Sequence, residues 1–239
     1  MNEVKINGVS SRELNLDIIS WSRDFLPTSR DELEYIEGKD GPIHRSKALG
    51  SRSLSITFRA YFDTDIERAK VQSDVAEWIF SKNFFKLEPS DEPNIYYMAK
   101  VLDDSDLDPE LFTSEFTIVF TCQPLKYGAN QEFVYSGTSS SFINAGTYES
   151  APIITINLWS STNNLVFTMN GFTISYESDS SLSSTDVIVI DGRELEFRVN
   201  GNLLVEEIEG HFPVVIKGDN EFSINTTADI TIDWQEQYL

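Results

Sequence analysis

Apolar and polar residues alternate along much of the chain, which is the pattern of strands that bury one face. In the clearest run, 53–62, the alternate positions are all apolar: Leu54, Ile56, Phe58, Ala60 and Phe62. A second run has its apolar positions at Phe116, Ile118, Phe120 and Cys122. The pattern therefore predicts a mainly β protein.

One segment has helical spacing instead. Asp63-Thr64-Asp65 supplies N-cap side chains, and residues 66–81 follow with apolar positions three and four apart. The apolar stripe consists of Ile66, Ala69, Val75, Ile79 and Phe80. We predict a single helix at about 66–81 that packs on a sheet.

Two strands and a turn follow the helix. Phe84–Glu88 and Ile95–Leu102 have strand character, and Pro89–Asn94 between them has turn chemistry, so a β-hairpin is expected. The acidic segment Asp103–Glu110 leads into the next strand, and Pro124–Gly128 ends this unit. We predict a domain boundary here, with domains at 1–128 and 129–239.

The second domain shows no helical signal. Its predicted strands are Pro152–Trp159, Leu165–Met169, Phe172–Tyr176, Val187–Ile190, Leu195–Val199, Phe212–Lys217, Phe222–Thr226 and Ile230–Trp234. Its predicted hairpin turns are Asn170-Gly171, Asp191-Gly192, Asn200-Gly201 and Gly218-Asp219-Asn220. Many short antiparallel strands with tight turns indicate a β-sandwich. The serine-rich tract Ser178–Ser184 is predicted to be a mobile loop.

The composition is that of folded domains with a large net negative charge. Hydrophobic residues make up 40% of the chain and include 16 Phe, so cores can form, and no apolar run approaches the roughly 20 residues of a membrane helix. The N-terminus does not resemble a signal peptide, which predicts synthesis in a cytoplasm. The net charge of −21 disfavours binding to nucleic acid or to anionic lipid.

Catalytic and metal-binding patterns are missing from the sequence. Cys122 is the lone cysteine and His44 and His211 are the two histidines, so zinc patterns and nucleophile–base pairs lack partners. There is no Gly-x-Ser-x-Gly elbow and no phosphate-binding glycine loop. We therefore predict no catalytic residues, no cofactor, no metal and no enzymatic activity.

Two weaker patterns leave alternatives open. Asp104, Asp106, Asp108 and Glu115 mimic part of a calcium loop, but Pro109 occupies the position of the turn-making glycine, so a solvated acidic loop is favoured. Sugar-binding aromatic candidates are Tyr148, Trp159, Tyr176, Trp234 and Tyr238. Packing is the favoured role for strand aromatics, and the alternation through Ile230 and Ile232 predicts that Trp234 is buried.

Three stretches match one known family in order and spacing. Ile36-Glu37-Gly38-Lys39-Asp40-Gly41 precedes the strand 52–62, and Tyr96–Val101 and Phe116–Pro124 end the first domain. Asn144–Ile156 then opens the second domain with the spacing Asn-x-Gly-Thr-x4-Pro-x-Ile. Together they resemble the distal tail protein family (Dit) of siphophages and their prophages, over nearly the whole chain.

The resemblance implies an N-terminal ring-forming β-sandwich with one helix and a β-hairpin, and a C-terminal galectin-like β-sandwich. It implies a structural baseplate hub protein in the virion tail tip. A homohexameric ring, which can be monomeric in dilute solution, would join the tail tube protein to the tail-tip or tail-associated protein and can anchor receptor-binding proteins. A galectin-like fold alone does not confer sugar binding.

The residues themselves suggest how such a ring would form. Ring closure needs head-to-tail surfaces, and the open edges of the 84–102 hairpin are expected to pair with a neighbouring subunit. DNA would pass through the lumen without specific binding, and we expect Asp103–Glu110 or the acids of Asp31–Glu37 to lie near it. The main alternative is a carbohydrate-binding or receptor-binding tail module, with Trp159 as the test residue. A third hypothesis is an enzyme such as a peptidoglycan hydrolase.

Overall fold

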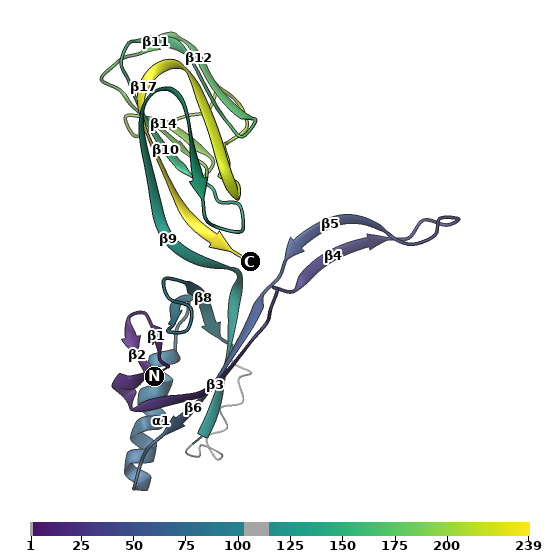
Figure 1. Cartoon of the computed structure of the whole chain (residues 1–239), viewed down its shortest axis with the longest axis vertical. Coiled ribbons are helices and arrows are strands. Elements are labelled where there is room, and N and C mark those ends of the chain that lie inside the picture. The colour runs from purple at the N-terminus through teal and green to yellow at the C-terminus, as the bar shows by residue number, and fades with distance from the viewer. Residues whose placement is uncertain (1, 103–114) are drawn as a thin grey trace. The chain divides into compact units, whose positions relative to one another are not determined.

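The computed structural model describes residues 2–102 and 115–239, without side-chain detail at 31–32, 44–47 and 178–180. The chain divides into two compact units, 1–126 with residue 239, and 127–238. β9 (Glu115–Asn144) continues through Pro124–Gly128, so a strand passes from one unit to the next where the sequence suggested an end. Figure 1 shows the elements of both units.

The described residues of the first unit form one larger antiparallel sheet, a separate hairpin and one α-helix. Its elements are β1 (Val4–Ile6), β2 (Val9–Ser10), the 3-10 turn η1 (Ser11–Leu14), β3 (Leu16–Arg23), β4 (Ser29–Glu34), β5 (Ile43–Leu49), β6 (Arg52–Ala60), α1 (Asp65–Ile79), β7 (Phe85–Pro89), β8 (Tyr96–Val101) and the start of β9. The strand order is β3-β6-β9-β8-β7-β1-β2. β4 and β5 form a separate two-stranded sheet.

The alternation seen in the sequence is the inner face of β6. Leu54, Ile56, Phe58 and Ala60 are all buried, and β6 pairs in register with β9 from Arg52↔Cys122 to Arg59↔Glu115. These side chains belong to a core that also receives residues from β1, β7, β8 and α1. The predicted strand and its buried face are confirmed.

The predicted single helix is confirmed as α1, but its buried stripe differs from the prediction. Thr64 is the N-cap, and its side chain and that of Glu67 form a reciprocal capping box. Val75 and Ile79 are buried, whereas Ile66, Ala69 and Phe80 are exposed. The reason is that the helix contacts the sheet through Val71, Val75, Trp78 and Ile79, positions separated by four, seven and eight residues. Ile66 and Phe80 lie at the two ends of the helix, outside that contact.

The second unit is a two-layer sandwich. Its elements are the end of β9, β10 (Ile153–Leu158), β11 (Thr162–Met169), β12 (Phe172–Leu182), β13 (Val187–Asp191), β14 (Glu196–Val199), β15 (Asn202–Leu204), β16 (Ile208–Gly210) and β17 (Gly218–Tyr238). One layer has the order β15-β14-β13-β10-β17-β9, and the other has β16-β12-β11-β17. The predicted mainly β fold with a sandwich is confirmed.

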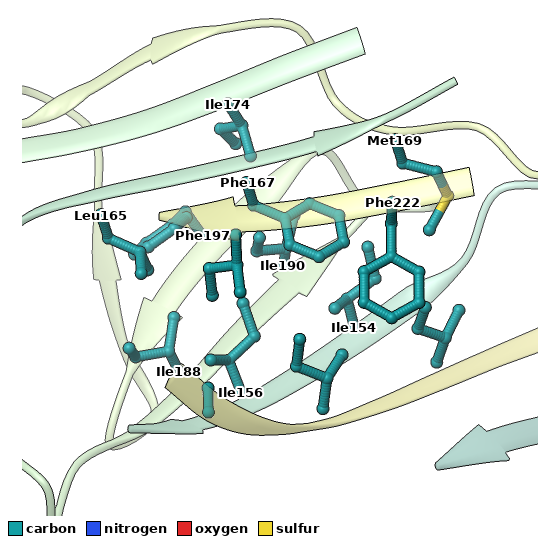
Figure 2. Close-up of a cluster of buried hydrophobic side chains, with 14 of the residues drawn as sticks. Ile154, Ile156, Leu165, Phe167, Met169, Ile174, Ile188, Ile190, Phe197 and Phe222 are labelled. Atoms are coloured by element: carbon teal, nitrogen blue, oxygen red, sulfur yellow. The ribbon is translucent and has the colours of Figure 1, made fainter. Parts of the chain in front are cut away.

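The two layers enclose a dry apolar core. Figure 2 shows side chains of β10 and β13, including Ile156 and Ile188, facing Phe167 and Ile174 of β11 and β12. Trp234 is buried as predicted, and its ring contacts Phe142. Burial of each large apolar side chain stabilises the fold by about 1.5–3 kcal/mol.

A single strand contributes to both layers. β17 pairs with β10 over Ala228–Asp233 and with β11 over Phe222–Ile224. The sequence suggested two separate strands here because residues 227–229 interrupt the apolar run. Both predicted segments lie in one continuous strand.

The hairpin turns follow the sequence at three of four predicted places. Asn170-Gly171 joins β11 to β12 and Asn200-Gly201 joins β14 to β15, each with both residues at positive φ. At Asp191-Gly192 the connection is longer, because the Asp191 carboxylate accepts bonds from two backbone N–H groups further on. Gly218-Asp219-Asn220 opens β17 and is not a hairpin turn.

Two other predictions about the second unit are wrong. The tract predicted to be a loop, Ser178–Ser184, belongs to β12 as far as Leu182, where the register with Thr162 resumes after a bulge. The predicted strand Phe212–Lys217 contains only an isolated bridge between Val215 and Ser150. In both segments, pairing of the backbone with a neighbouring strand determines whether a strand forms, and the β propensity of the side chains does not.

The Asn-x-Gly-Thr spacing has a structural cause. Asn144 is buried, donates to Ile216 O at 3.2 Å, and accepts from Gly146 N at 3.0 Å and Trp234 Nε1 at 3.1 Å. A Cβ at Gly146 would lie 2.8 Å from Gln237 O, so only glycine fits there. Thr147 N then donates to the same Gln237 carbonyl.

Candidate assembly surface

The hairpin of β4 and β5, called the arm below, is the first candidate surface. Its strands pair from Ser29↔Leu49 to Glu34↔Ile43 with one register shift. Among the described residues neither strand pairs with the larger sheet (Figure 1). A two-stranded hairpin in water is marginally stable alone, so the arm needs a partner surface.

The base of the arm is closed by specific bonds. Thr28 Oγ1 and Thr28 N both donate to Ser51 O, at 2.8 and 3.0 Å, and Gly50 N donates to Thr28 O at 2.7 Å. A Cβ at Gly50 would lie 2.3 Å from Thr28 Oγ1, so a side chain there would break the closure. Asp24 also accepts a bond from Ser53 N at 2.7 Å. These bonds fix where the two arm strands leave the sheet.

Large apolar side chains are exposed along this region. Phe25 is 94% exposed and Tyr35 is 75% exposed, with Leu26, Leu33 and Ile36 also exposed. Exposed apolar side chains gathered on one element mark interaction sites in soluble proteins. The arm and its base therefore have the character of an interface.

The strand that leads into the arm has an open side. Among the described residues, β3 pairs only with β6, and a bulge between Ile18 and Ser20 interrupts that pairing. Its other edge presents backbone N–H and C=O groups to solvent, which is a template for a further strand. β3 and the arm thus follow each other in the chain, and among the described residues each has a strand edge without a pairing partner.

The open strand edge predicted from the sequence lies at the 84–102 hairpin, whereas the open edge in the structure belongs to β3. The hairpin at 84–102 has no open edge, because β7 pairs with β1 and β8 pairs with β9. That prediction is wrong because β1, three residues long, was too short to be recognised in the sequence.

An ionic cluster joins the end of β3 to the β7–β8 turn. Arg23 pairs with Asp91 at 2.6 Å, Lys126 pairs with Glu92 at 3.1 Å, and Tyr97 donates to Glu92. Burial, and then the neighbouring Glu92, raise the pKa of Tyr97. For Arg23, burial alone would lower the pKa, but Asp91, Tyr97 and Glu92 outweigh it and the pKa is raised. Such partly buried pairs fix the orientation of the strand from which the arm departs.

Arg52 is a buried cation, and two nitrogen atoms of its guanidinium group lack a hydrogen-bonding partner among the described residues. Its side chain is 3% exposed, and its Nε and Nη2 atoms have no partner among the described residues. Because an unpaired buried charge costs several kcal/mol, we expect Arg52→Met to raise the free energy of unfolding by about 1–3 kcal/mol. Urea denaturation of purified protein measures this. Arg59→Met is the control, since Arg59 is an exposed partner of Glu115 and should change stability by less than about 1 kcal/mol. A lower stability for Arg52→Met would show that the guanidinium is satisfied in solution.

Cys122 is buried opposite Arg52 and its thiol is held neutral. Burial raises the pKa of Cys122 from 9.0 to about 12. The folded state therefore binds the proton more tightly, so its contribution to stability is complete below pH 9 and is lost as pH rises towards 12. We expect stability to fall by about 1.4 kcal/mol per pH unit from this group within that window, and the fall to shrink in Cys122→Val. Denaturant midpoints measured at several alkaline pH values test this, and an equal slope in both proteins would contradict it.

The remaining predicted candidates do not gather into a site. His211 is exposed after β16, His44 lies on β5, and Trp159 is exposed between β10 and β11. Asp103–Glu110 and the calcium-like spacing fall outside the described residues, apart from Glu115. Within 2–102 and 115–239, no three His, Cys, Asp or Glu side chains are arranged to hold a metal ion. Of the helices formed by these residues, none has the length and apolar character needed to cross a membrane.

Two family models match the chain, one in each unit. Residues 12–122 match the phage tail protein RIFT-related domain, and residues 145–238 match the siphovirus-type tail component, C-terminal domain. The chain belongs to the siphophage distal tail protein family. It is a structural protein of the baseplate hub at the tail tip, as the sequence resemblance implied. Comparison with curated proteins gives no sequence match.

Solved structures show the same fold in a distal tail protein. The crystal structure of the Dit protein of phage SPP1, presented as a paradigm of the hub adsorption apparatus in phages that infect Gram-positive hosts, is 16% identical with a TM-score of 0.80. All of this chain and all of that chain are covered. The phage p2 baseplate in its activated conformation with Sr is 11% identical over 98% of both chains, with a TM-score of 0.40.

The two strands of the arm were not predicted from the sequence, although the turn that joins them was recognised. Gly38 and Gly41 both have positive φ, as the Gly-Lys-Asp-Gly resemblance requires. The flanking strands were not recognised because residues 29–34 and 43–49 show no alternation of apolar and polar side chains. A turn motif followed by a long strand was the signal that could have found them.

Proposed function

We propose that this family member acts as the subunit of a closed homohexameric ring that joins the tail tube protein to the tail-tip protein. Residues 1–128 would form the ring, and residues 129–239 would be the galectin-like sandwich that projects from it. The arm is the observation that carries this proposal, because it exposes apolar side chains and, within the part of the chain that the structure describes, its strands have no partner in the larger sheet.

The arm suits a head-to-tail contact. Each of its strands is about 20 Å long, so it can reach a surface beyond its own subunit. A contact between an arm and a different surface of the next subunit is heterologous, and such contacts close into a ring when the rotation allows. The open edge of β3 is a suitable second element, since an added strand gains backbone hydrogen bonds.

The charge supports passage of DNA through the ring. With a net charge of −21 the chain has no electrostatic affinity for phosphates, and DNA would slide without counterion release. We infer that the acids of Asp31–Glu37 or Asp103–Glu110 contribute to the lumen. The same subunit would anchor receptor-binding proteins, and it would act by assembly alone, with no catalytic step.

Electron microscopy of virions that carry labelled protein tests the proposal. Label at the junction of tail tube and tail tip, with sixfold density, is expected. Label elsewhere on the virion, or a different rotational symmetry, would contradict it. Light scattering across a concentration series shows whether the free subunit is monomeric when dilute, and clearing in a zymogram by the purified protein would contradict a purely structural role.

A further inference from the structure

The second unit carries a hollow surface that the assembly role does not use. Two adjoining pockets, of about 760 and about 540 Å³, share Ser141 of β9 and Asp219 of β17. One extends over the β11–β12 turn at Gly171, and the other extends over Phe133. Together they form one continuous groove, called the β9–β17 groove below.

The larger pocket presents unused hydrogen-bonding groups. Four serines line it, and none of their side-chain hydroxyls makes a hydrogen bond within the described residues: Ser139, Ser140, Ser141 and Ser223. The carboxylates of Asp219 and Glu221 line the same pocket, and they have no ion-pair partner among those residues. Short hydroxyls and carboxylates are the groups that exchange hydrogen bonds with a ligand rich in hydroxyls.

The smaller pocket adds an aromatic surface. Phe133 lines it, is half-buried, and lies nearly parallel to Tyr135, with ring centroids 6.5 Å apart and an interplanar angle of 14°. Tyr135 is held along the backbone at Gly137, where a Cβ would lie 2.8 Å from the Tyr135 hydroxyl. Phe133 also stacks on Phe142, with ring centroids 5.2 Å apart, and the part of its ring that stays exposed lies in the same pocket as the Glu132 carboxylate. An aromatic surface and a carboxylate together offer the apolar and the polar contact that a sugar ring makes.

The floor of the groove is fixed before any ligand binds. Asn170 lies at its edge, donates to Val214 O and Asn220 Oδ1, and accepts from Glu221 N. Phe222 packs beneath, against Phe133 and Phe167. A preorganised surface loses little entropy on binding.

The charge of the groove restricts the class of ligand. Among the described residues that line either pocket none is basic, so phosphate-rich or sulfated polymers are repelled. We propose that the β9–β17 groove binds a non-anionic oligosaccharide, through the serine hydroxyls and Asp219 at one end and Phe133 at the other. A cationic peptide would satisfy the carboxylates but would leave the row of hydroxyls without a role.

Binding of the full chain to an array of glycans, followed by calorimetry with each glycan that binds, tests this proposal. We expect binding to neutral glycans, at least about tenfold weaker binding in Ser141→Trp, which fills the centre of the groove, and about fivefold weaker binding in Asp219→Asn. Thr138→Trp is the matched control, because Thr138 is exposed on the same strand outside the lining and should leave affinity unchanged. Trp159→Ala should also leave it unchanged.

Several results would overturn the proposal. They are the absence of binding to any glycan, binding to anionic glycans alone, full affinity in both Ser141→Trp and Asp219→Asn, and loss of binding in Trp159→Ala. Binding of a lysine-rich peptide in place of glycans would assign the groove to a protein partner. Circular dichroism establishes that the variants are folded, and ring assembly is expected to be the same in all of them, so the two proposals fail separately.

Discussion

Removal of the arm is expected to abolish ring assembly while leaving both units folded. Residues 30–48 can be deleted and Ser29 joined to Leu49 through Asn-Gly, because these two residues are paired across the hairpin and a two-residue turn fits between them. None of the described side chains of the deleted segment belongs to either core, so the free energy of unfolding should change by less than about 1 kcal/mol. Light scattering at rising concentration, and incorporation into tails, measure assembly.

Point variants show whether assembly depends on the apolar side chains of the arm and its base, or on exposed apolar side chains anywhere on the protein. Tyr35→Ser and Phe25→Ser should each weaken assembly, because both side chains are exposed and would be buried in a contact. Trp159→Ser is the control, since Trp159 is also exposed but lies on the second unit. Normal rings from the arm-deleted protein would assign closure to another surface.

Asn220→Ala is expected to destabilise the second unit by about 3–5 kcal/mol. Asn220 is fully buried; its Oδ1 accepts from Ile216 N at 2.8 Å and Asn170 Nδ2 at 2.7 Å, and its Nδ2 donates to Ile216 O at 3.0 Å and Gly218 O at 2.8 Å. Alanine removes all four bonds and leaves buried backbone groups unsatisfied. Urea denaturation followed by circular dichroism measures the change.

An exposed asparagine on the same strand provides the matched comparison. Asn225 also bridges strands, accepting from Val166 N and donating to Asn164 O, but it is open to solvent. Water can replace its bonds, so Asn225→Ala should cost only about 1 kcal/mol. Equal losses for the two variants would mean that water reaches the Asn220 site.

The parts of the fold that were predictable are those in which one face is buried. In β6 and the first residues of β9, apolar and polar side chains alternate because each strand presents one side to a core. The helix could be predicted because its first turn is capped. The arm could not be found in this way, because the sequences of its two strands do not alternate between apolar and polar residues. β17 was divided in two because residues 227–229 interrupt its apolar run, although its buried positions stay on one face from Phe222 to Trp234.

The candidate surfaces depend on contacts that are distant in the sequence. The β9–β17 groove brings Ser141 beside Asp219, and nothing in the local sequence of either residue indicates the other. Trp159 was a reasonable candidate by residue type and is exposed, but it lies outside both pockets. Sequence patterns therefore identified the family and the layers, whereas the three-dimensional arrangement identified the surfaces.

The sharing of β17 between both layers has a consequence for biosynthesis. Every other strand of the second unit precedes β17 in the chain, so neither layer can be completed until the ribosome has translated it. A product that stops short of β17 would expose the apolar residues of two unfinished layers and would be a substrate for proteases. Defective copies would thus be cleared from the infected cell before they could enter a tail.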